Sequence, residues 1–329
     1  MEFRQHFIDE LFKINKSNFN KKALALFNYQ YTYNAIYKHY VDSLKKNPSS
    51  VQSIIDIPYL PVTFFKSEKI ITGNFEPAKC FYSSGTTEKS TRSKHYLVDT
   101  DLYKKTFSTF FTNQYGPISD YIILALLPSY QENKDSSLLY MVDWLIQETG
   151  NVFSSFVSTD FPAFFATLEQ CRKQPKKILL IGVSYALLEL AEQHHPNLSD
   201  CIVMETGGMK GRRAEMIKAE IHEYLKKSFT IENIHSEYGM TELLSQAYSK
   251  ENGIFQCPSW MKILVRQVND PFDLRESGRG AVNIIDLANI DSCAFIEIQD
   301  LGNLFPDGSF EILGRMDNTE VRGCNLLYA

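Results

Sequence analysis

Between residues 121 and 234, short β-rich apolar runs alternate with longer segments in which apolar residues recur at helical spacing. This order is typical of crossover βαβ units, which lay strands side by side in a mostly parallel sheet with helices on its faces. The predicted strands are residues 121–127, 152–157, 177–183, 201–205 and 230–235, and the predicted helices lie near residues 136–148, 162–173, 185–193 and 212–227. The sequence therefore predicts an α/β fold.

The segments on either side follow other patterns. Near the N-terminus, apolar residues recur at spacings of three and four, which indicates amphipathic helix, at Phe3, Phe7, Leu11 and Ile14. After about residue 251, short strands alternate with turns such as Pro306-Asp307-Gly308. We expect a helical cap and connector over residues 1–60, an α/β core over 61–250, and a β-rich subdomain over 251–329 that ends in a mobile segment.

Composition excludes several classes of protein. Of the 329 residues, 44% are hydrophobic and 22% charged, and the net charge of −5 provides no overall cationic field for nucleic acid. The longest apolar run, near residues 121–128, is far shorter than the ~20 residues of a membrane-spanning helix. The N-terminus lacks an apolar signal segment, and the six cysteines include no Cys-x-x-Cys pair. We therefore expect a cytoplasmic protein with no membrane span, no nucleic-acid partner and no zinc cage.

A loop rich in hydroxyl side chains follows Tyr82. Residues 83–91 supply six Ser and Thr side chains, one glycine and one lysine. Hydroxyl and backbone N–H groups bind phosphate oxygens, and a glycine lets the backbone approach them closely. The Gly-x-x-x-x-Gly-Lys-Ser/Thr pattern of a Walker loop is absent. Composition alone favours the alternative, an ordinary solvated Ser/Thr loop.

A second polar group, residues 237–242, follows the predicted strand 230–235. In open α/β sheets, ligands bind at this carboxyl edge of the strands. The Glu242 carboxylate could hold Mg²⁺, the Thr241 hydroxyl could bond a phosphate oxygen, and the Tyr238 ring could stack on a purine. The alternative is a helix start in which Thr241 or Ser236 is the cap.

Four segments, in this order along the chain, resemble motifs of the adenylate-forming superfamily of acyl-CoA synthetases, firefly luciferase and nonribosomal-peptide adenylation domains. Residues 82–87 are similar to its phosphate loop, and residues 238–242 to its Tyr-Gly-x-Thr-Glu motif. Residues 300–302 are similar to the aspartate element that holds the ribose hydroxyls, and residues 314–318 to the Gly-Arg-x-Asp hinge motif. The resemblance implies the large N-terminal domain of that fold and an enzyme that uses ATP and Mg²⁺.

Within the superfamily, the chain most resembles the LuxE-type acyl-protein synthetases of the bacterial luminescence fatty-acid reductase complex, through features at residues 205–212, 235–237 and 322–324. The resemblance implies that a carboxylic acid, expected to be a fatty acid, is activated as an acyl-adenylate. The acyl group would then pass through a thioester on Cys324 to a partner such as a reductase, a synthase or a carrier protein.

The expected site combines these interpretations. The candidate catalytic residues are Cys324, Thr241 and Glu242, with Glu242 also the metal ligand. The candidate nucleotide-binding residues are Ser83, Ser84, Gly85, Thr86, Thr87, Gly207, Gly208, Tyr238, Gly239, Asp300 and Arg315. The paired glycines would let a ligand approach the backbone, although an ordinary strand-to-helix turn is the alternative.

The end of the chain concerns the second half-reaction, in which the acyl group leaves the acyl-adenylate for its acceptor. Members of the superfamily continue past the hinge motif into a mobile domain with a catalytic lysine, which we expect this chain, ending at Ala329, to lack. Cys324 lies five residues from the end and could attack an acyl-adenylate as a thiolate, or could be an inert small apolar residue. Two other functions stay open: direct acyl transfer to coenzyme A or a carrier with no covalent intermediate, and a non-catalytic nucleotide- or acyl-binding scaffold.

Overall fold

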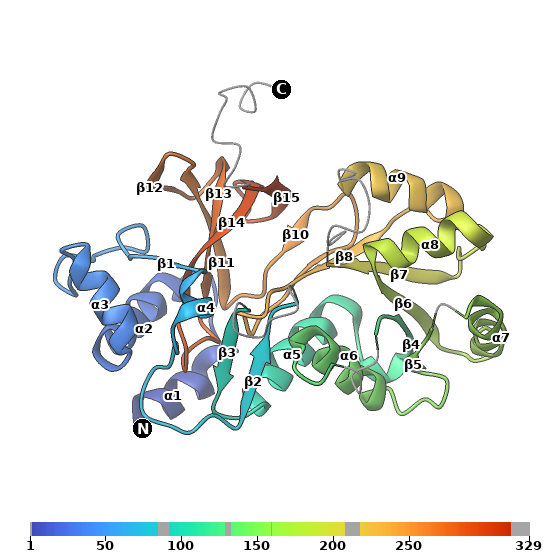
Figure 1. Ribbon diagram of the computed structural model, residues 1–329, viewed down its shortest axis with the longest axis horizontal. Coiled ribbons are helices and arrows are strands. Elements are labelled where there is room, and N and C mark those ends of the chain that lie inside the picture. Colours follow the sequence, from blue (N-terminus) through green and yellow to red (C-terminus); the bar gives the residue numbers. More distant parts are fainter. Residues whose placement is uncertain (1, 85–91, 129–132, 159, 208–217, 317–329) are drawn as a thin grey trace.

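One mixed sheet extends across the molecule, and helices pack around it (Figure 1). The computed structural model describes residues 2–84, 92–128, 133–158, 160–207 and 218–316. Within that part the strand order is β12-β11-β13-β14-β15-β10-β9-β8-β7-β6-β4-β5, with β1 beside β14, while β2 and β3 form a separate ribbon.

The bounds of these elements are as follows. The helices are α1 (Glu2–Leu11), α2 (Phe19–Tyr33), α3 (Ala35–Ser43), α4 (Phe64–Ser67), α5 (Asp101–Tyr115), α6 (Ser137–Glu148), α7 (Phe161–Cys171), α8 (Ser184–His194) and α9 (Lys218–Phe229). The strands are β1 (Leu60–Pro61), β2 (Lys79–Tyr82), β3 (Lys94–Leu97), β4 (Tyr121–Leu126), β5 (Ser155–Phe156), β6 (Lys177–Val183), β7 (Cys201–Thr206), β8 (His235–Tyr238), β9 (Ala247–Ser249), β10 (Phe255–Gln256), β11 (Met261–Gln267), β12 (Asp270–Arg275), β13 (Gly278–Asp286), β14 (Phe295–Leu304) and β15 (Phe310–Arg315).

Strands β5, β4, β6, β7 and β8 run parallel to one another. Every residue of β4 is buried, as are all residues of β6 after Lys177. Strands that are covered on both faces are apolar without interruption, which is why these runs stand out in the sequence. Helices α5 and α6 cover one face of this half, and α8 and α9 cover the other (Figure 1). The predicted α/β fold class is confirmed.

Side-chain caps explain where two of these helices begin. The Ser136 hydroxyl accepts a hydrogen bond from the backbone N–H of Leu139 at 3.3 Å, at the start of α6. The Asp160 carboxylate accepts one from the N–H of Ala163 at 3.5 Å, and Pro162 occupies the first turn of α7. The predicted helices 136–148 and 162–173 are therefore confirmed to within two residues at each end.

The sheet changes direction at β8. Strand β8 is parallel to β7 but antiparallel to β9, with Tyr238 opposite Ala247. From β9 onward the strands pair antiparallel through β10, β15, β14, β13, β11 and β12. Residues 239–246, which contain most of the Tyr-Gly-Met-Thr-Glu motif, connect the two halves at this point.

The N-terminal helices pack against the antiparallel half. The side-chain amide of Gln30, on α2, donates to the carbonyl of Asn289 at 2.8 Å and accepts from the N–H of Ala294 at 2.9 Å. Arg4, on α1, binds both carboxylate oxygens of Asp291 at 2.5 and 2.7 Å. These polar contacts hold the start of the chain against a turn more than 250 residues later.

Two predicted strands differ from the structure. The predicted strand 230–235 is wrong, because Thr230 adopts a left-handed backbone with φ of 58° and the strand begins only at His235. Glu237 and Tyr238 therefore lie within β8 and not beyond its end. Strand β5 is shorter than the predicted 152–157, because Asn151 forms a turn in which its side chain accepts from the N–H of Phe153 at 2.9 Å.

Candidate functional site

Strands β8, β14 and β15 bring a hydroxyl, a carboxylate and a guanidinium together at the Tyr-Gly-Met-Thr-Glu motif of residues 238–242. The Tyr238 hydroxyl, on β8, donates to Asp300 Oδ2 on β14 at 2.7 Å. Arg315, directly opposite Asp300 on β15, places its Nε 3.7 Å from Asp300 Oδ1. Burial, together with the Asp300 charge, holds the pKa of Tyr238 far above its ordinary value. The structure thus joins three predicted site residues that are far apart in the sequence.

An aromatic group lies next to this cluster. The Tyr238 ring is 5.8 Å from the rings of both Phe255 and Phe310, and those two rings stack on each other at 5.3 Å. Phe255 is on β10 and Phe310 on β15, so the antiparallel half supplies the apolar support for Tyr238. The phenol is held in place by packing at its ring and by Asp300 at its oxygen.

Glu242 is a buried carboxylate close to the β2–β3 ribbon. The residue is 5% exposed, and this burial raises its pKa. A hydrogen bond from Ser93 and the positive charge of Arg315 act in the opposite direction and lower the pKa, but burial has the larger effect. The N–H of Ser93 in turn donates to the Ser83 hydroxyl at 3.0 Å. The structure therefore places the first residue of the candidate phosphate loop near Glu242.

His95 positions the backbone of the motif. Its Nδ1 lies 2.8 Å from the carbonyl of Thr241, and its Nε2 lies 2.9 Å from the hydroxyl of Ser292. Burial lowers the pKa of His95 to about 4, so the ring is neutral, with Nδ1–H donating and Nε2 accepting. The Thr241 hydroxyl makes no hydrogen bond among the described residues, which leaves it available to a ligand.

Asp286 and Asn289 hold the chain after the motif. Asp286 Oδ2 accepts from the N–H groups of Leu244 and Ser245 at 3.0 and 2.9 Å, and the Asn289 amide donates to the carbonyl of Glu242 at 2.7 Å. Burial raises the pKa of Asp286 to about 6. These contacts draw residues 241–245 into a turn that enters β9, so the alternative of a helix start is wrong.

Sequence reasoning did not single out His95, Asp286 or Asn289. Each acts on backbone atoms of a segment that is distant in the chain, and no local pattern marks such a contact. The only sequence signal is that Asp286 ends the apolar run of β13, with Asn289 three residues later.

The end of β7 holds a second group of predicted residues. Gly207 is exposed, with a φ of 75° that favours glycine, and its carbonyl accepts from the Ser184 hydroxyl at 3.0 Å. Glu205 is buried 3.1 Å from the ammonium of Lys218. Burial acts to raise the pKa of the Glu205 carboxyl. The positive charge of Lys218 and a hydrogen bond with His222 outweigh burial and lower that pKa to about 2.

The remaining predicted residues are placed as follows. Ser84 is exposed two residues after the end of β2, and Gly239 follows Tyr238 at the reversal of the sheet. The other predicted residues lie outside the described residues: Gly85, Thr86, Thr87, Gly208 and Cys324. Among the described residues no group of three or more His, Cys, Asp or Glu side chains forms a metal cage. A single carboxylate such as Glu242 suits Mg²⁺ that shares its coordination sphere with phosphate oxygens and water.

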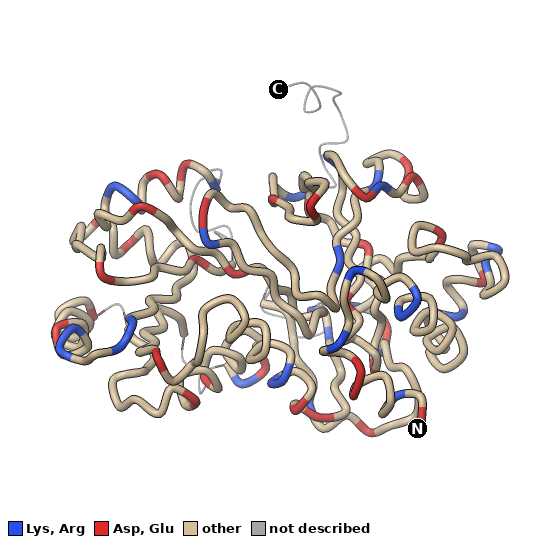
Figure 2. Tube along the Cα trace, turned by 180° about the vertical axis from the view of Figure 1, so that it is seen from behind, with Lys and Arg blue, Asp and Glu red and all other residues tan. Residues whose placement is uncertain are grey.

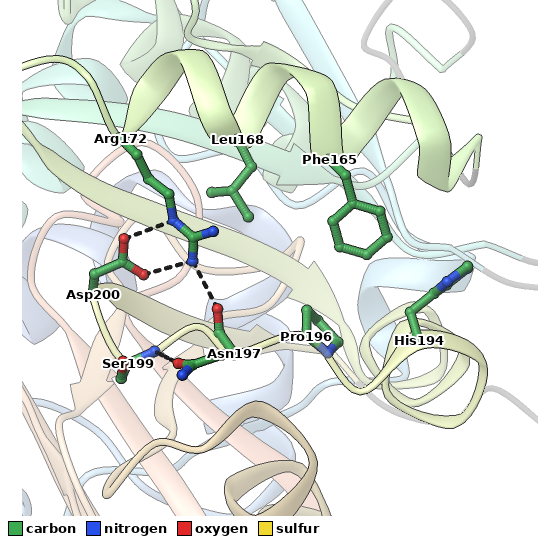
Figure 3. Close-up of a pocket in the computed structure, with 8 residues that line it drawn as sticks. All are labelled: Phe165, Leu168, Arg172, His194, Pro196, Asn197, Ser199 and Asp200. Carbon is green, nitrogen blue, oxygen red and sulfur yellow. Dashed lines mark hydrogen bonds and ion pairs between the residues drawn. The ribbon is translucent and has the colours of Figure 1, made fainter.

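A shallow groove of about 560 Å³ lies apart from this site, between α7 and the turn that leads into β7 (Figure 3). Arg172 binds both carboxylate oxygens of Asp200 there, at 2.8 and 2.9 Å, and donates to the carbonyl of Asn197 at 2.7 Å. No predicted site residue lines the groove. The guanidinium fastens α7 to the turn, so its role is structural.

Acidic and basic residues are interspersed over the elements seen in Figure 2. Across the part of the chain that the structure describes, no helix has both the length and the apolar character to cross a membrane.

Several solved structures are similar to this chain. ATP-bound MatB from Rhodopseudomonas palustris is 15% identical at a TM-score of 0.54, covering 74% of this chain and 49% of that chain. Apo MatB from the same organism is 15% identical at a TM-score of 0.51, covering 73% and 48%. O-succinylbenzoate Coenzyme A Synthetase (MenE) from Bacillus subtilis, in complex with ATP and magnesium ion, is 16% identical at a TM-score of 0.49, covering 73% and 50%.

The likeness to MatB shows a shared fold, and this chain spans about half the length of the solved structures that it matches. The expectation of an adenylate-forming α/β fold is therefore confirmed. A search of the curated proteins gives no match. The family model described as Acyl-protein synthetase, LuxE matches residues 10–329. Because that match covers all but the first nine residues, the chain belongs to the LuxE acyl-protein synthetase family.

Proposed function

We propose that this chain is an enzyme that uses ATP to activate a carboxylic acid as an acyl-adenylate and then transfers the acyl group to a protein thiol. The observation that carries the proposal is the convergence of Tyr238, Asp300 and Arg315 beside the turn that holds Glu242. Membership of the LuxE family and the fold shared with MatB, solved with ATP bound, support it.

The nucleotide would lie along the edge where the sheet changes direction. Asp300 would accept hydrogen bonds from the ribose hydroxyls, and Arg315, whose side chain is two-thirds exposed, would reach toward the phosphates. The loop from Ser83 through Thr87 and the Thr241 hydroxyl would donate to phosphate oxygens. Gly207, Gly208 and Gly239 would let the ligand approach the backbone.

Glu242 is the proposed ligand of Mg²⁺. When bound, Mg²⁺ supplies positive charge that offsets the charge on the phosphate oxygens. The burial that raises the pKa of Glu242 also makes its carboxylate a strong electrostatic partner for a cation, because little water screens it. The positive charge of Arg315 acts in the opposite sense and lowers that pKa.

Activation makes the acid reactive toward a thiol. A carboxylate oxygen bonds to the α-phosphorus of ATP and pyrophosphate leaves. The thiolate of Cys324 then attacks the acyl carbon, a carbon–sulfur bond forms, and the bond to the phosphate oxygen breaks to release AMP. The thioester would pass its acyl group to a partner, which we expect to be a reductase, a synthase or a carrier protein, and the acid is expected to be a fatty acid.

The described cysteines are poor alternatives to Cys324 as the nucleophile. Burial raises the pKa of the Cys201 and Cys293 thiols to about 12 and raises that of Cys257 further. Burial also raises the pKa values of Cys80 and Cys171. A raised pKa leaves little thiolate near neutral pH, and the thiolate is the reactive form.

Exchange of pyrophosphate into ATP, measured over a panel of carboxylic acids, tests the proposal. Exchange that depends on both Mg²⁺ and an acid is expected. Intact-mass analysis after incubation with ATP and an active acid should then show an acyl adduct on Cys324. Exchange without an adduct would favour direct transfer to coenzyme A or a carrier. Tight nucleotide binding with no exchange for any acid would favour a non-catalytic scaffold.

A further inference from the structure

Lys66, on the short helix α4, is a cation that the proposed half-reactions leave without a role. The residue is exposed, and among the described residues its side chain makes no hydrogen bond or ion pair. An exposed lysine is ordinarily solvated and needs no partner. Lys66 differs from an ordinary surface lysine in the place where the fold anchors its helix, which lies between β1 and the β2–β3 ribbon (Figure 1).

Strand β1 brings α4 to the edge of β14 that also receives β15. The N–H of Val62, directly after β1, donates to the carbonyl of Glu297 on β14 at 2.8 Å. Two residues farther along β14, the carbonyl of Gln299 accepts from the N–H of Met316 at 2.7 Å. Carbonyls two residues apart on a strand point to the same side, so the end of β15 takes the place that β1 would occupy next. The chain therefore turns into α4 close to the end of β15 that carries Arg315.

An aromatic contact connects α4 to the Tyr-Gly-Met-Thr-Glu motif. Phe65 is fully buried, and its ring lies 6.0 Å from the ring of His95, at an angle of 88°. His95 is the residue whose Nδ1 holds the carbonyl of Thr241. A single side chain therefore separates α4 from the backbone of the motif. Because Phe65 faces inward, Lys66 extends from a helix that is fixed in position.

The charges near the motif are unequally paired. The positive charges of Arg315 and Lys66 both act to lower the pKa of the Glu242 carboxyl, although burial outweighs them. Arg315 already has a carboxylate beside it, since its Nε is 3.7 Å from Asp300. The described part of the chain gives Lys66 no such carboxylate. The fold thus leaves one unpaired cation near a carboxylate that is proposed to hold Mg²⁺, which suits an anion with several negative charges.

We propose that the Lys66 ammonium binds the phosphates of ATP and stabilises the charge that develops on pyrophosphate as it leaves, which makes Lys66 a further catalytic residue of the adenylation step. This inference rests on the proposed function, because it requires ATP to bind along this edge of the sheet. As the carboxylate oxygen bonds to the α-phosphorus, the bond from that phosphorus to the bridging oxygen breaks, and its electron pair stays with pyrophosphate. The ammonium keeps its protons and offsets this charge.

Lys66 and Arg315 would have different tasks in this arrangement. The guanidinium of Arg315 is held beside Asp300, so it is positioned near the proposed ribose site. A lysine has a flexible stem and three donors, so its ammonium can follow phosphate oxygens that move as the α-phosphorus changes partner. Lys66 therefore suits the part of ATP that departs, and Arg315 the part that stays.

Lys66→Gln tests the contact first by binding, with no acid present. Isothermal titration calorimetry compares ATP, AMP and adenosine on the variant and on wild type. We expect the Kd for ATP to rise roughly 10- to 100-fold and the Kd for adenosine to stay the same, because only the phosphates contact the ammonium. The AMP result shows whether the α-phosphate shares the contact. In pyrophosphate exchange, kcat/KM for ATP should fall by at least the same factor, with part of the loss in kcat.

Two further variants serve as controls. Lys66→Arg keeps the charge and should recover most of the ATP affinity that Lys66→Gln loses. Lys69→Gln removes an equally exposed charge from the same segment, where the ammonium of Lys69 lies 5.6 Å from the centre of the Tyr96 ring. It should leave both ATP binding and exchange unchanged. Circular dichroism and thermal unfolding confirm that each variant is folded.

The outcomes separate this inference from the function on which it rests. If wild type exchanges pyrophosphate and Lys66→Gln binds ATP equally well, the contact is overturned and the proposed activity stands. Equal losses for ATP and adenosine, or equal losses in the Lys66 and Lys69 variants, also overturn it, because they indicate a structural effect or a general effect of charge. If no acid supports exchange but Lys66→Gln alone weakens ATP binding, the proposed activity fails and the phosphate contact stands. If wild type does not bind ATP, both are overturned.

Discussion

Tyr238 and Asp300 are joined by a 2.7 Å hydrogen bond from phenol to carboxylate, although 62 residues separate them in the chain. The bond crosses from the parallel half of the sheet to the antiparallel half. It therefore connects the motif that begins at the last residue of β8 to the strand that carries the candidate ribose-binding aspartate.

Removal of this hydroxyl in Tyr238→Phe should weaken ATP binding while the protein stays folded. A hydrogen bond to a charged group contributes ~1.5–3 kcal/mol, so we expect the KM for ATP to rise roughly 10- to 100-fold. Pyrophosphate exchange at varied ATP concentrations measures this KM. Tyr33→Phe, which alters a 56% exposed phenol, is the control. An unchanged KM would show that Asp300 does not need Tyr238 to bind the nucleotide.

Changes in the motif itself should stop acyl-adenylate formation. Glu242→Gln keeps the shape of the side chain but removes its charge, and Thr241→Ala removes the free hydroxyl. Loss of one stabilising group in a comparable site lowers the rate ~10²–10³-fold. The Glu242 variant should also need more Mg²⁺ for half-maximal exchange. Wild-type exchange at wild-type Mg²⁺ concentrations would refute its assignment as the metal ligand.

Cys324→Ser should separate the two half-reactions. The variant should still exchange pyrophosphate, because Thr241 and Glu242 are unaltered. It should carry no thioester, because a serine hydroxyl is a much weaker nucleophile than a thiolate near neutral pH. Mass spectrometry detects the adduct, with Cys80→Ser as the control that keeps it. Acyl transfer to the natural acceptor at the wild-type rate by the serine variant would make direct transfer the better account.

His95 should make stability depend on pH in a defined direction. Burial lowers its pKa from 6.5 to about 4, so the unfolded chain binds a proton that the folded protein excludes. The free energy of unfolding should therefore fall as pH falls from about 6.5 toward 4, by up to ~1.4 kcal/mol per pH unit from this residue. His95→Gln cannot titrate and keeps a donor for the Thr241 carbonyl.

Asp286 acts in the opposite direction over part of this range, because its pKa is raised to about 6 and its neutral form is favoured in the folded protein. The His95 contribution is therefore measured as the difference between wild type and His95→Gln, by denaturant titration at several pH values. A difference that does not change with pH would contradict the neutral, buried imidazole.

The sequence by itself determined the elements whose signals are local. Strands β4 and β6 are apolar without interruption because both of their faces are covered, and α6 and α7 begin at side chains that cap their own first turns. The four motifs could also be found without the structure, since their residues are adjacent in the chain. Local periodicity failed at residues 230–235, where a left-handed Thr230 delays the strand and moves Glu237 and Tyr238 into it.

Only the tertiary structure decided what surrounds the motif. His95 reaches the Thr241 carbonyl from the β2–β3 ribbon, Asn289 reaches the Glu242 carbonyl, and Asp300 arrives on β14. The same holds for Gln246, whose buried Oε1 has no hydrogen-bond partner among the described residues. Burial, pKa and hydrogen-bond satisfaction depend on which distant segments exclude water from a side chain, and these contacts exist only once the sheet has closed around the motif.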